Sequence, residues 1–242
     1  MIKQYTLVAR AAADNSKKYG KSICSAGICP IDGLIRVYPL LTQTKMKAWD
    51  TYEVEVEQRR TDTRAESWHA DVEFAPHKIG KQDRYECLGL LAKNHLATSI
   101  RELNAKKQSL AVIVPDRINE MWFDTRDEAG HDWGKRSVFE VPRIAYELAG
   151  KTHQQQIIEM GCYEWLRNGR NEPSRLWDNL RFTDPNYRHM FLVGNQARFR
   201  NSWMIIDVLQ IKLSKWNHES VLSLERLESQ KGINTCSRWE SV

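Results

Sequence analysis

The sequence predicts an α+β protein in which strands predominate, and two patterns support this fold class. Apolar and polar residues alternate in several short runs of the first and last thirds of the chain, which is typical of strands with one buried face. Two segments in the middle place apolar residues three and four positions apart, which indicates amphipathic helices. The 242 residues are enough for one large domain or two small ones.

The first third of the chain is predicted to be a set of strands. Residues 5–9 form the first strand. Residues 22–29 and 34–39 form a hairpin, because the segment between them ends in an Asp-Gly step that favours tight turns. Residues 51–57 alternate apolar with acidic side chains, so we expect a strand with one face in water.

The middle of the chain is predicted to contain two helices and a strand. The helical spacing covers residues 94–107 and residues 154–168. Residues 109–115 are a continuous apolar run that ends in proline, which favours a buried strand. Residues 119–134 are polar with scattered aromatic side chains, and we expect a loop and a domain boundary there.

The end of the chain returns to strands. Residues 190–195 and 202–209 are predicted strands joined by a basic turn over residues 196–201. The remaining residues, 217–242, are expected to carry one short helix near residues 221–227 within a polar C-terminal extension.

Composition excludes several classes of protein. No apolar run approaches the roughly 18 residues that cross a bilayer, and the first residues lack the apolar centre of a secretory signal. Five scattered cysteines favour free thiols in a reducing cytoplasm over a disulfide framework or a zinc knuckle. The formal net charge of +5 permits an anionic partner. We therefore expect a cytoplasmic protein with no membrane contact.

Common catalytic and cofactor motifs are absent. The sequence contains no glycine-rich phosphate loop, no His-Glu-x-x-His, no zinc-deaminase pattern and no Gly-x-Ser-x-Gly. The seven histidines are dispersed, and their spacing fits no compact metal motif. We expect no cofactor and no metal.

A dense polar cluster follows the alternating strand, over residues 59–71. Its arginines could position a phosphate while a neighbouring carboxylate or imidazole acts as acid or base. The alternative is a solvated loop whose charges pair with each other. If the protein is an enzyme, the candidate catalytic residues are Asp62, Glu66 and His69.

Arginines are interleaved with aromatic residues between positions 165 and 200. This stretch contains seven Arg, no Lys and three acidic residues. Guanidinium groups bind phosphate as planar forks, and aromatic faces stack on unpaired bases for about 1–3 kcal/mol each. The alternative is that the aromatic side chains fill the core and the arginines solvate its rim. Together with the polar cluster and a shared strand face at positions 36 and 38, the candidate nucleic-acid-binding residues are Arg36, Tyr38, Arg59, Arg60, Arg64, Trp68, Arg188, Arg198, Arg200 and Trp203.

Six short blocks spread over nearly the whole chain form a further pattern, at residues 17–39, 62–67, 109–113, 163–166, 191–195 and 203–208. They resemble the dual OB-containing domain family of prokaryotic defence and conflict systems. Leu34 and Ala65 depart from the family pattern, which has a bulky residue and a proline at these positions. The resemblance implies two OB-like β-barrels with helical insertions: residues 1–120, and residues 121–242 with a C-terminal extension.

These observations lead to one main functional hypothesis and two alternatives. The main hypothesis is a nucleic-acid-binding protein, for single-stranded, distorted or modified DNA or RNA, in a prokaryotic antiviral setting. The first alternative is an enzyme that acts on nucleic acid, such as a nuclease or a base-removing enzyme. The second is a module that docks a partner protein of the same defence locus.

Overall fold

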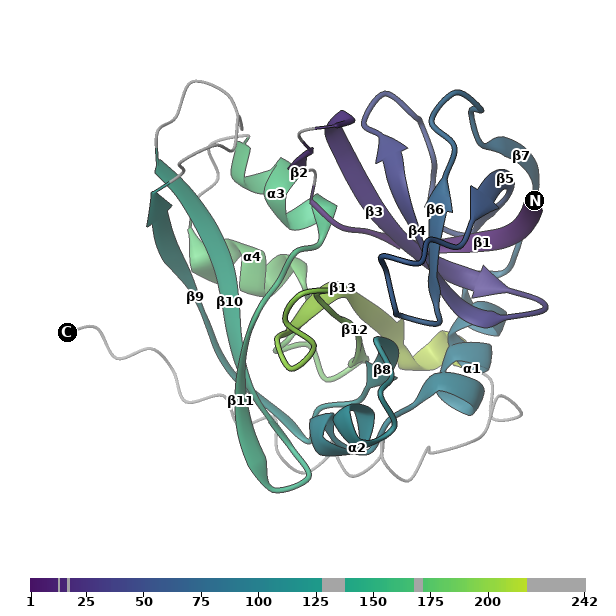
Figure 1. Cartoon of the computed structure of the whole chain (residues 1–242). Helices are drawn as coiled ribbons and strands as arrows, with labels where there is room; N and C mark the ends of the chain where they lie inside the picture. The colour runs from purple at the N-terminus through teal and green to yellow at the C-terminus, as the bar shows by residue number, and fades with distance from the viewer. Residues whose placement is uncertain (13, 17, 128–137, 168–171, 217–242) are drawn as a thin grey trace.

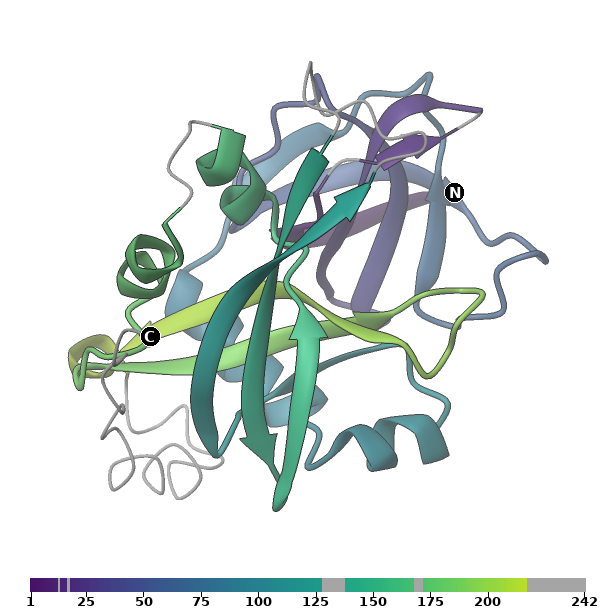
Figure 2. The same cartoon turned by 90° about the vertical axis from the view of Figure 1, so that its left-hand side faces the viewer.

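The computed structural model describes residues 1–12, 14–16, 18–127, 138–167 and 172–216 of the chain (Figure 1). Strands predominate, as the sequence predicts. An N-terminal barrel lies beside two further sheets, and the helices lie at the edges of this assembly (Figures 1 and 2).

The N-terminal unit is a single seven-stranded sheet that closes on itself. Its strands are β1 (Ile2–Arg10), β2 (Asp14–Ser16), β3 (Gly20–Cys29), β4 (Gly33–Leu41), β5 (Asp50–Glu57), β6 (Ser67–Ala70) and β7 (His77–Lys81). Five of them form a closed barrel in the order β1-β3-β4-β6-β5, because β5 also pairs with β1. The β4–β6 pair is parallel, and the other four barrel pairs are antiparallel. β2 extends β3, and β7 pairs with β5.

Sequence periodicity explains the barrel core. The apolar residues of β5, including Val54 and Val56, are buried inside the barrel, while Glu55 and Glu57 point to solvent. The predicted hairpin of β3 and β4 is confirmed. Gly33 begins β4 with φ of 73°, and an added Cβ there would lie 2.8 Å from the ring of His95. Glycine at this turn therefore meets both a backbone and a packing requirement.

The second unit consists of two three-stranded sheets. One contains β8 (Leu110–Ile113), β12 (Tyr187–Asn195) and β13 (Trp203–Lys212), and the other contains β9 (Arg117–Asp127), β10 (Val138–Leu148) and β11 (Lys151–Gln156). They enclose one core and are linked by a parallel bridge between Ile157 and Ile205. Within the described residues the pairings close only the N-terminal barrel, so the second barrel stays a prediction.

The short strand β8 contributes to two cores at once. Leu110 and Val112 pack toward the barrel, in a cluster with Leu34 of β4. Ala111 and Ile113 point the other way, into the core between the two three-stranded sheets. The sheet β8-β12-β13 is therefore buried on both faces, which explains the continuous apolar run in its sequence.

The helices differ from the predicted ones. They are α1 (Arg84–His95), α2 (Ile100–Ala105), α3 (Met160–Arg167) and α4 (Pro173–Asn179), with a 3₁₀ turn, η1 (Leu213–Lys215), after β13. The single helix predicted over residues 94–107 is wrong, because Leu96 is extended and forms a bridge with Val112. The Ala97 N–H also donates to the Val112 carbonyl at 2.8 Å. Pairing with β8 thus separates α1 from α2.

Two further predictions need correction. The helix predicted over residues 154–168 begins only at Met160, because residues 154–156 pair with β10 as part of β11. The loop predicted from residue 119 is strand β9 up to Asp127, paired along its length with β10. The helix expected near residues 221–227 lies outside the described residues. The domain boundary after residue 120 stays a prediction, although β8 on its N-terminal side pairs with β12 on the other.

Candidate functional site

An open pocket of about 320 Å³ lies on the outer face of the barrel. We call it the barrel pocket. It is formed by the turn between β2 and β3, the outer faces of β4 and β6, the connection between β5 and β6, and the turn between β12 and β13. Its lining residues are Tyr19, Arg36, Tyr38, Arg59, Thr61, Asp62, Arg64, Ser67, Trp68, His69 and Ala197.

Strand register brings two rings of the pocket together. Tyr38 on β4 lies opposite His69 on the parallel strand β6. Successive side chains of a strand point to opposite faces, and Val37 belongs to the barrel core. Tyr38 and His69 therefore share the outer face, with their ring centroids 6.5 Å apart in an edge-on arrangement.

Tyr19 completes this aromatic group from the β2–β3 turn. Its ring centroid lies 5.4 Å from that of His69, and its hydroxyl is 3.0 Å from His69 Nε2. Arg59 Nη1 donates to the same hydroxyl at 3.0 Å. We call Tyr19, Tyr38 and His69 the ring cluster, because their mutual contacts and Arg59 hold three rings at one place.

The electrostatics of the ring cluster favour an anion nearby. Burial, and then the positive charge of Arg59, lower the pKa of His69 below its ordinary value, so its imidazole is neutral at pH 7. Hydrogen bonding by Lys18, followed by the Arg59 contact, lowers the pKa of Tyr19. The rings thus lie beside permanent cations without adding positive charge themselves.

Arg64 and Asp62 form a forked ion pair at the edge of the pocket. Arg64 donates from Nε at 2.8 Å and from Nη2 at 2.6 Å to the two carboxylate oxygens of Asp62. Burial acts in the opposite direction, but the Arg64 bonds lower the pKa of Asp62 to about 2. Arg64 Nη1 also donates to the carbonyl of Asn195 at 2.9 Å, so the pair ties the barrel to the end of β12.

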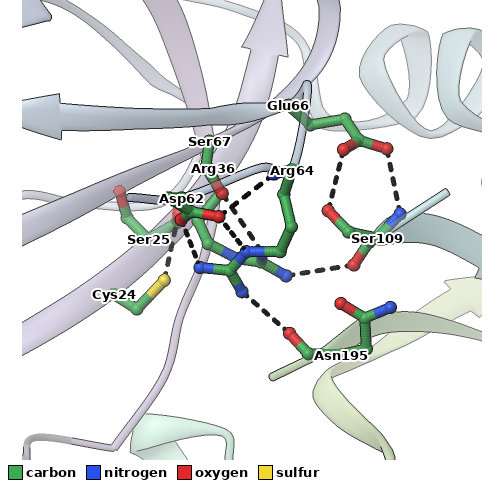
Figure 3. Close-up of polar contacts among 9 residues, drawn as sticks. All are labelled: Cys24, Ser25, Arg36, Asp62, Arg64, Glu66, Ser67, Ser109 and Asn195. Carbon is green, nitrogen blue, oxygen red and sulfur yellow. Dashed lines mark hydrogen bonds and ion pairs between the residues drawn. The ribbon is translucent and has the colours of Figure 1, made fainter. Parts of the chain in front are cut away.

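Arg36 lies beneath this pair and is buried, with 3% of its surface exposed. It donates from Nη2 to the carbonyl of Ser109 at 3.0 Å and from Nη1 to Ser67 Oγ at 3.4 Å (Figure 3). Burial lowers its pKa to about 10, so the guanidinium remains charged at neutral pH. Gly194 provides the necessary space, because a Cβ there would lie 2.7 Å from Arg36 Nη2.

Glu66 closes the same group of contacts. Its carboxylate accepts bonds from the Ser109 N–H at 3.0 Å and from Ser109 Oγ at 2.8 Å (Figure 3). We call this group of residues the junction network, and its members are Arg36, Asp62, Arg64, Glu66, Ser67, Ser109 and Asn195. It joins the barrel to the sheet β8-β12-β13 through buried or half-buried polar bonds.

The predicted site residues separate into two groups. Tyr38, Arg59 and Arg64 line the pocket, and Arg60 is exposed beside them. Arg198 is exposed and Arg200 half-buried in the turn that borders the pocket at Ala197.

Four predicted residues have internal contacts instead: Arg36, as described above, and Trp203, Trp68 and Arg188. Arg36 and Trp68 also border the barrel pocket. Trp203 is 5% exposed in the core between the sheets, and its Nε1 donates to Asn104 Oδ1 at 2.8 Å. The ring of Trp68 packs in the barrel core under Lys3. Arg188 is buried and donates to the carbonyls of Pro185 and Tyr187. The rings of Trp203 and Trp68 offer no open stacking face, because both are packed in hydrophobic cores.

The three candidate catalytic residues have separate partners. Asp62 is paired with Arg64, Glu66 with Ser109, and His69 with Tyr19. Asp62 and His69 both line the barrel pocket. The catalytic assignment stays a prediction.

Sequence reasoning missed Tyr19 as a residue of the pocket. Tyr19 was hidden in a lysine-rich segment, where an isolated aromatic residue was the available signal. Phe199 is 63% exposed at the tip of the β12–β13 turn, beside Arg198. It belongs to the aromatic residues between positions 165 and 200 that were expected to offer stacking faces, and its ring is exposed. Trp177, Phe182 and Phe191 of the same stretch are buried in the core between the sheets.

Other features of the described part bear on the predictions. Cys24, Cys29, Cys87 and Cys162 are free thiols. In the described ranges, no group of three or more His, Cys, Asp or Glu side chains is placed to hold a metal ion. The helices described here are all too short or too polar to cross a bilayer.

One family model covers the N-terminal barrel. Residues 2–87 match the model of a domain of unknown function (DUF8758), and this range contains all seven strands of the barrel sheet. A search of curated proteins found no match.

Two solved structures show a distant likeness to the chain. A murine DNA-binding protein bound to double-stranded DNA has a TM-score of 0.35 at 7% identity, covering 87% of this chain and 97% of that one. The tetrameric p202 HIN2 has a TM-score of 0.34 at 8% identity, covering 87% and 92%. Both TM-scores are too low to establish a shared fold.

Proposed function

We propose that the protein binds unpaired nucleic acid, DNA or RNA, on the outer face of its N-terminal barrel. One observation carries the proposal: the barrel pocket collects three aromatic rings and three arginines at the meeting point of three loops and two strands. Phosphates would contact Arg59, which is the most exposed of the three arginines, and exposed bases would stack on the ring cluster.

The position of the pocket supports this function. OB-type barrels bind oligonucleotides on the face of their second and third strands and on the loops after the first and fourth strands. In this barrel the second and third strands are β3 and β4, and the loops correspond to the segments that carry Tyr19 and Arg59. The pocket lies where both loops meet β4 and its neighbour β6.

The chemistry of the pocket also fits the ligand. A base stacked on an aromatic side chain contributes about 1–3 kcal/mol, and stacking tolerates any base. Arg59 extends from the β5–β6 connection with about a third of its side chain exposed, so its guanidinium can reach a phosphate. Arg198 and Phe199 on the neighbouring β12–β13 turn add an exposed guanidinium and an exposed aromatic ring beside the pocket.

Binding is tested with a labelled oligonucleotide of about 16 nucleotides, as DNA and as RNA, by fluorescence anisotropy. We expect the affinity to fall as salt is raised from about 50 mM to about 200 mM, because phosphate contacts release counterions. Arg59→Ala should weaken binding several-fold and reduce the salt dependence. Arg101→Ala, which removes an exposed arginine of α2, is the matched control and should change neither. A salt-independent affinity that is the same in all three proteins would overturn the proposal.

The biological setting follows from the family resemblance. We propose that the protein acts in a prokaryotic antiviral system, with an OB-like second unit and a partner protein from the same locus. Cells that express the wild-type chain should resist phage better than cells that express Arg59→Ala. Equal plaque counts would contradict the antiviral role and leave nucleic-acid binding as a separate question.

A further inference from the structure

A second open pocket, of about 520 Å³, adjoins the barrel pocket. The two share Tyr19, Arg59 and His69, which form a common wall between them. Beyond this wall the lining comes from β5, from the end of β6 and the segment that follows it, and from Met1 and Lys18. We call this second space the acidic pocket.

The charge of the lining changes across the common wall. The barrel pocket is lined by three arginines and one aspartate, and that aspartate is already paired with Arg64. The acidic pocket is lined by four carboxylates, from Glu55, Glu57, Asp71 and Glu73. Lys18, Arg59 and the N-terminal ammonium of Met1 also line it, so carboxylates exceed cations by one, whereas arginines exceed carboxylates in the barrel pocket. Glu57 pairs with Arg59 at 3.0 Å, whereas Glu55 and Glu73 are exposed.

Secondary structure fixes this change of charge. Glu55 and Glu57 belong to the alternating run of β5, so the same pattern that fills the barrel core aims carboxylates outward. Asp71 accepts a bond from the Glu73 N–H at 3.0 Å, in a turn that directly follows β6. Strand β5 and this turn therefore fix the backbone positions from which the carboxylates extend.

We infer that the barrel pocket receives the end of a nucleic-acid strand, not its interior. The inference rests on the proposed function. A strand that passed through the pocket and continued past Tyr19, Arg59 and His69 would bring its next phosphates beside Glu55, Asp71 and Glu73. Phosphates and carboxylates are both negatively charged and repel each other. A groove that follows a nucleic-acid strand needs positive charge along its length. The excess of carboxylates therefore disfavours a strand that continues past the common wall.

Pocket size agrees with a terminal nucleotide. About 320 Å³ is near the lower limit for pockets that hold small molecules, so the barrel pocket suits one nucleotide better than several. A terminal base has only one neighbour in the strand, so stacking on the ring cluster replaces a contact that the strand end lacks. Arg59 stands at the wall, where the last phosphate would lie.

The experiment compares a linear oligonucleotide of about 16 nucleotides with a circle of the same sequence, which has no ends. We expect the linear form to bind at least about ten-fold more tightly in the same salt. Equal affinities for the two forms would overturn the strand-end inference and leave the proposed function intact. If neither form binds, the proposed function itself fails.

A charge variant tests the cause of this preference. Glu55→Gln combined with Glu73→Gln should tighten binding of the circle a few-fold, because a continuing strand would meet less repulsion. The matched control, Glu120→Gln combined with Glu164→Gln, removes two exposed carboxylates from β9 and α3 and should leave the ratio of affinities unchanged. A thermal melt confirms that both variants are folded. The same increase in both variants would show a general charge effect and contradict the role of the acidic pocket.

Discussion

Arg36 and Tyr38 lie two residues apart on β4 and share its outer face, yet they have opposite surroundings. Arg36 is covered by the Ser109 carbonyl and by Gly194, whereas Tyr38 faces an open pocket. The covered half of the face holds the barrel against the sheet β8-β12-β13, and the open half is available for a ligand. A polar residue on a strand surface acquires its role from what the rest of the chain places over it.

The largest expected effect comes from removing the covered residue. Arg36→Ala would leave the Ser109 carbonyl without its donor and empty a buried volume, so the free energy of unfolding should fall by about 3 kcal/mol. Chemical denaturation measures this loss. Binding per folded molecule should change little, and a variant that stays stable but loses binding would reverse the roles assigned to the two halves.

A smaller loss of stability is expected from adding a methyl group next to the Arg36 guanidinium. Gly194→Ala would bring a Cβ within 2.7 Å of Arg36 Nη2 and 2.6 Å of Ile206 Cδ1. Overpacking of this kind costs about 1–3 kcal/mol of unfolding free energy. Gly80→Ala on β7 is the control, because an added Cβ there meets nothing within 4 Å. Equal melting temperatures for the two variants would contradict tight packing over Arg36.

Truncating Tyr38, on the open half of the face, should weaken binding and leave folding unchanged. Tyr38→Ala removes a ring of the cluster and should weaken oligonucleotide binding by about 1–3 kcal/mol. The unfolding free energy should change by less than about 1 kcal/mol, because the side chain is only half-buried. Tyr38→Phe keeps the ring and should keep the affinity. If the Phe variant binds as weakly as the Ala variant, the hydroxyl and not the ring makes the contact.

The smallest effect concerns the charge of His69. Its pKa is lowered by burial and by Arg59, so the ring is neutral at pH 7 and gains a proton as the pH falls. The imidazolium would then attract phosphate, and affinity should rise a few-fold between about pH 7 and pH 5. His69→Gln should remove this rise, and His77→Gln, at an exposed position of β7, should retain it. A flat profile in the wild-type protein would place His69 away from phosphate.

The sequence predicted the parts of this structure that depend on local pattern. Alternation identified β5, because each strand of a barrel has one face in the core, and the Asp-Gly step identified the hairpin of β3 and β4. Periodicity failed at Leu96 and Ala97, where pairing with Val112 outweighs helical spacing. That pairing partner becomes a neighbour only through the tertiary fold.

The candidate site shows the same limit. The sequence placed Arg36 and Tyr38 on one face, and this is correct. It could not show that Ser109, 73 residues away, covers Arg36, or that Arg64 reaches Asn195 across 131 residues. Trp68 and Trp203 were expected to be open stacking rings, yet both fill cores. Residue type predicts what a side chain can bind, but burial is decided by distant segments.

The two-sided packing of β8 has a consequence for how the molecule moves. A fragment that ended at residue 120 would keep this strand but lack β12, its pairing partner, and would leave Ala111 and Ile113 in water. We therefore expect neither half to be stable when expressed alone. Hinge motion between the barrel and the second unit would expose one of the two cores to which β8 contributes. We therefore expect a ligand to rearrange the loops around its pocket and to leave the relative position of the two units unchanged.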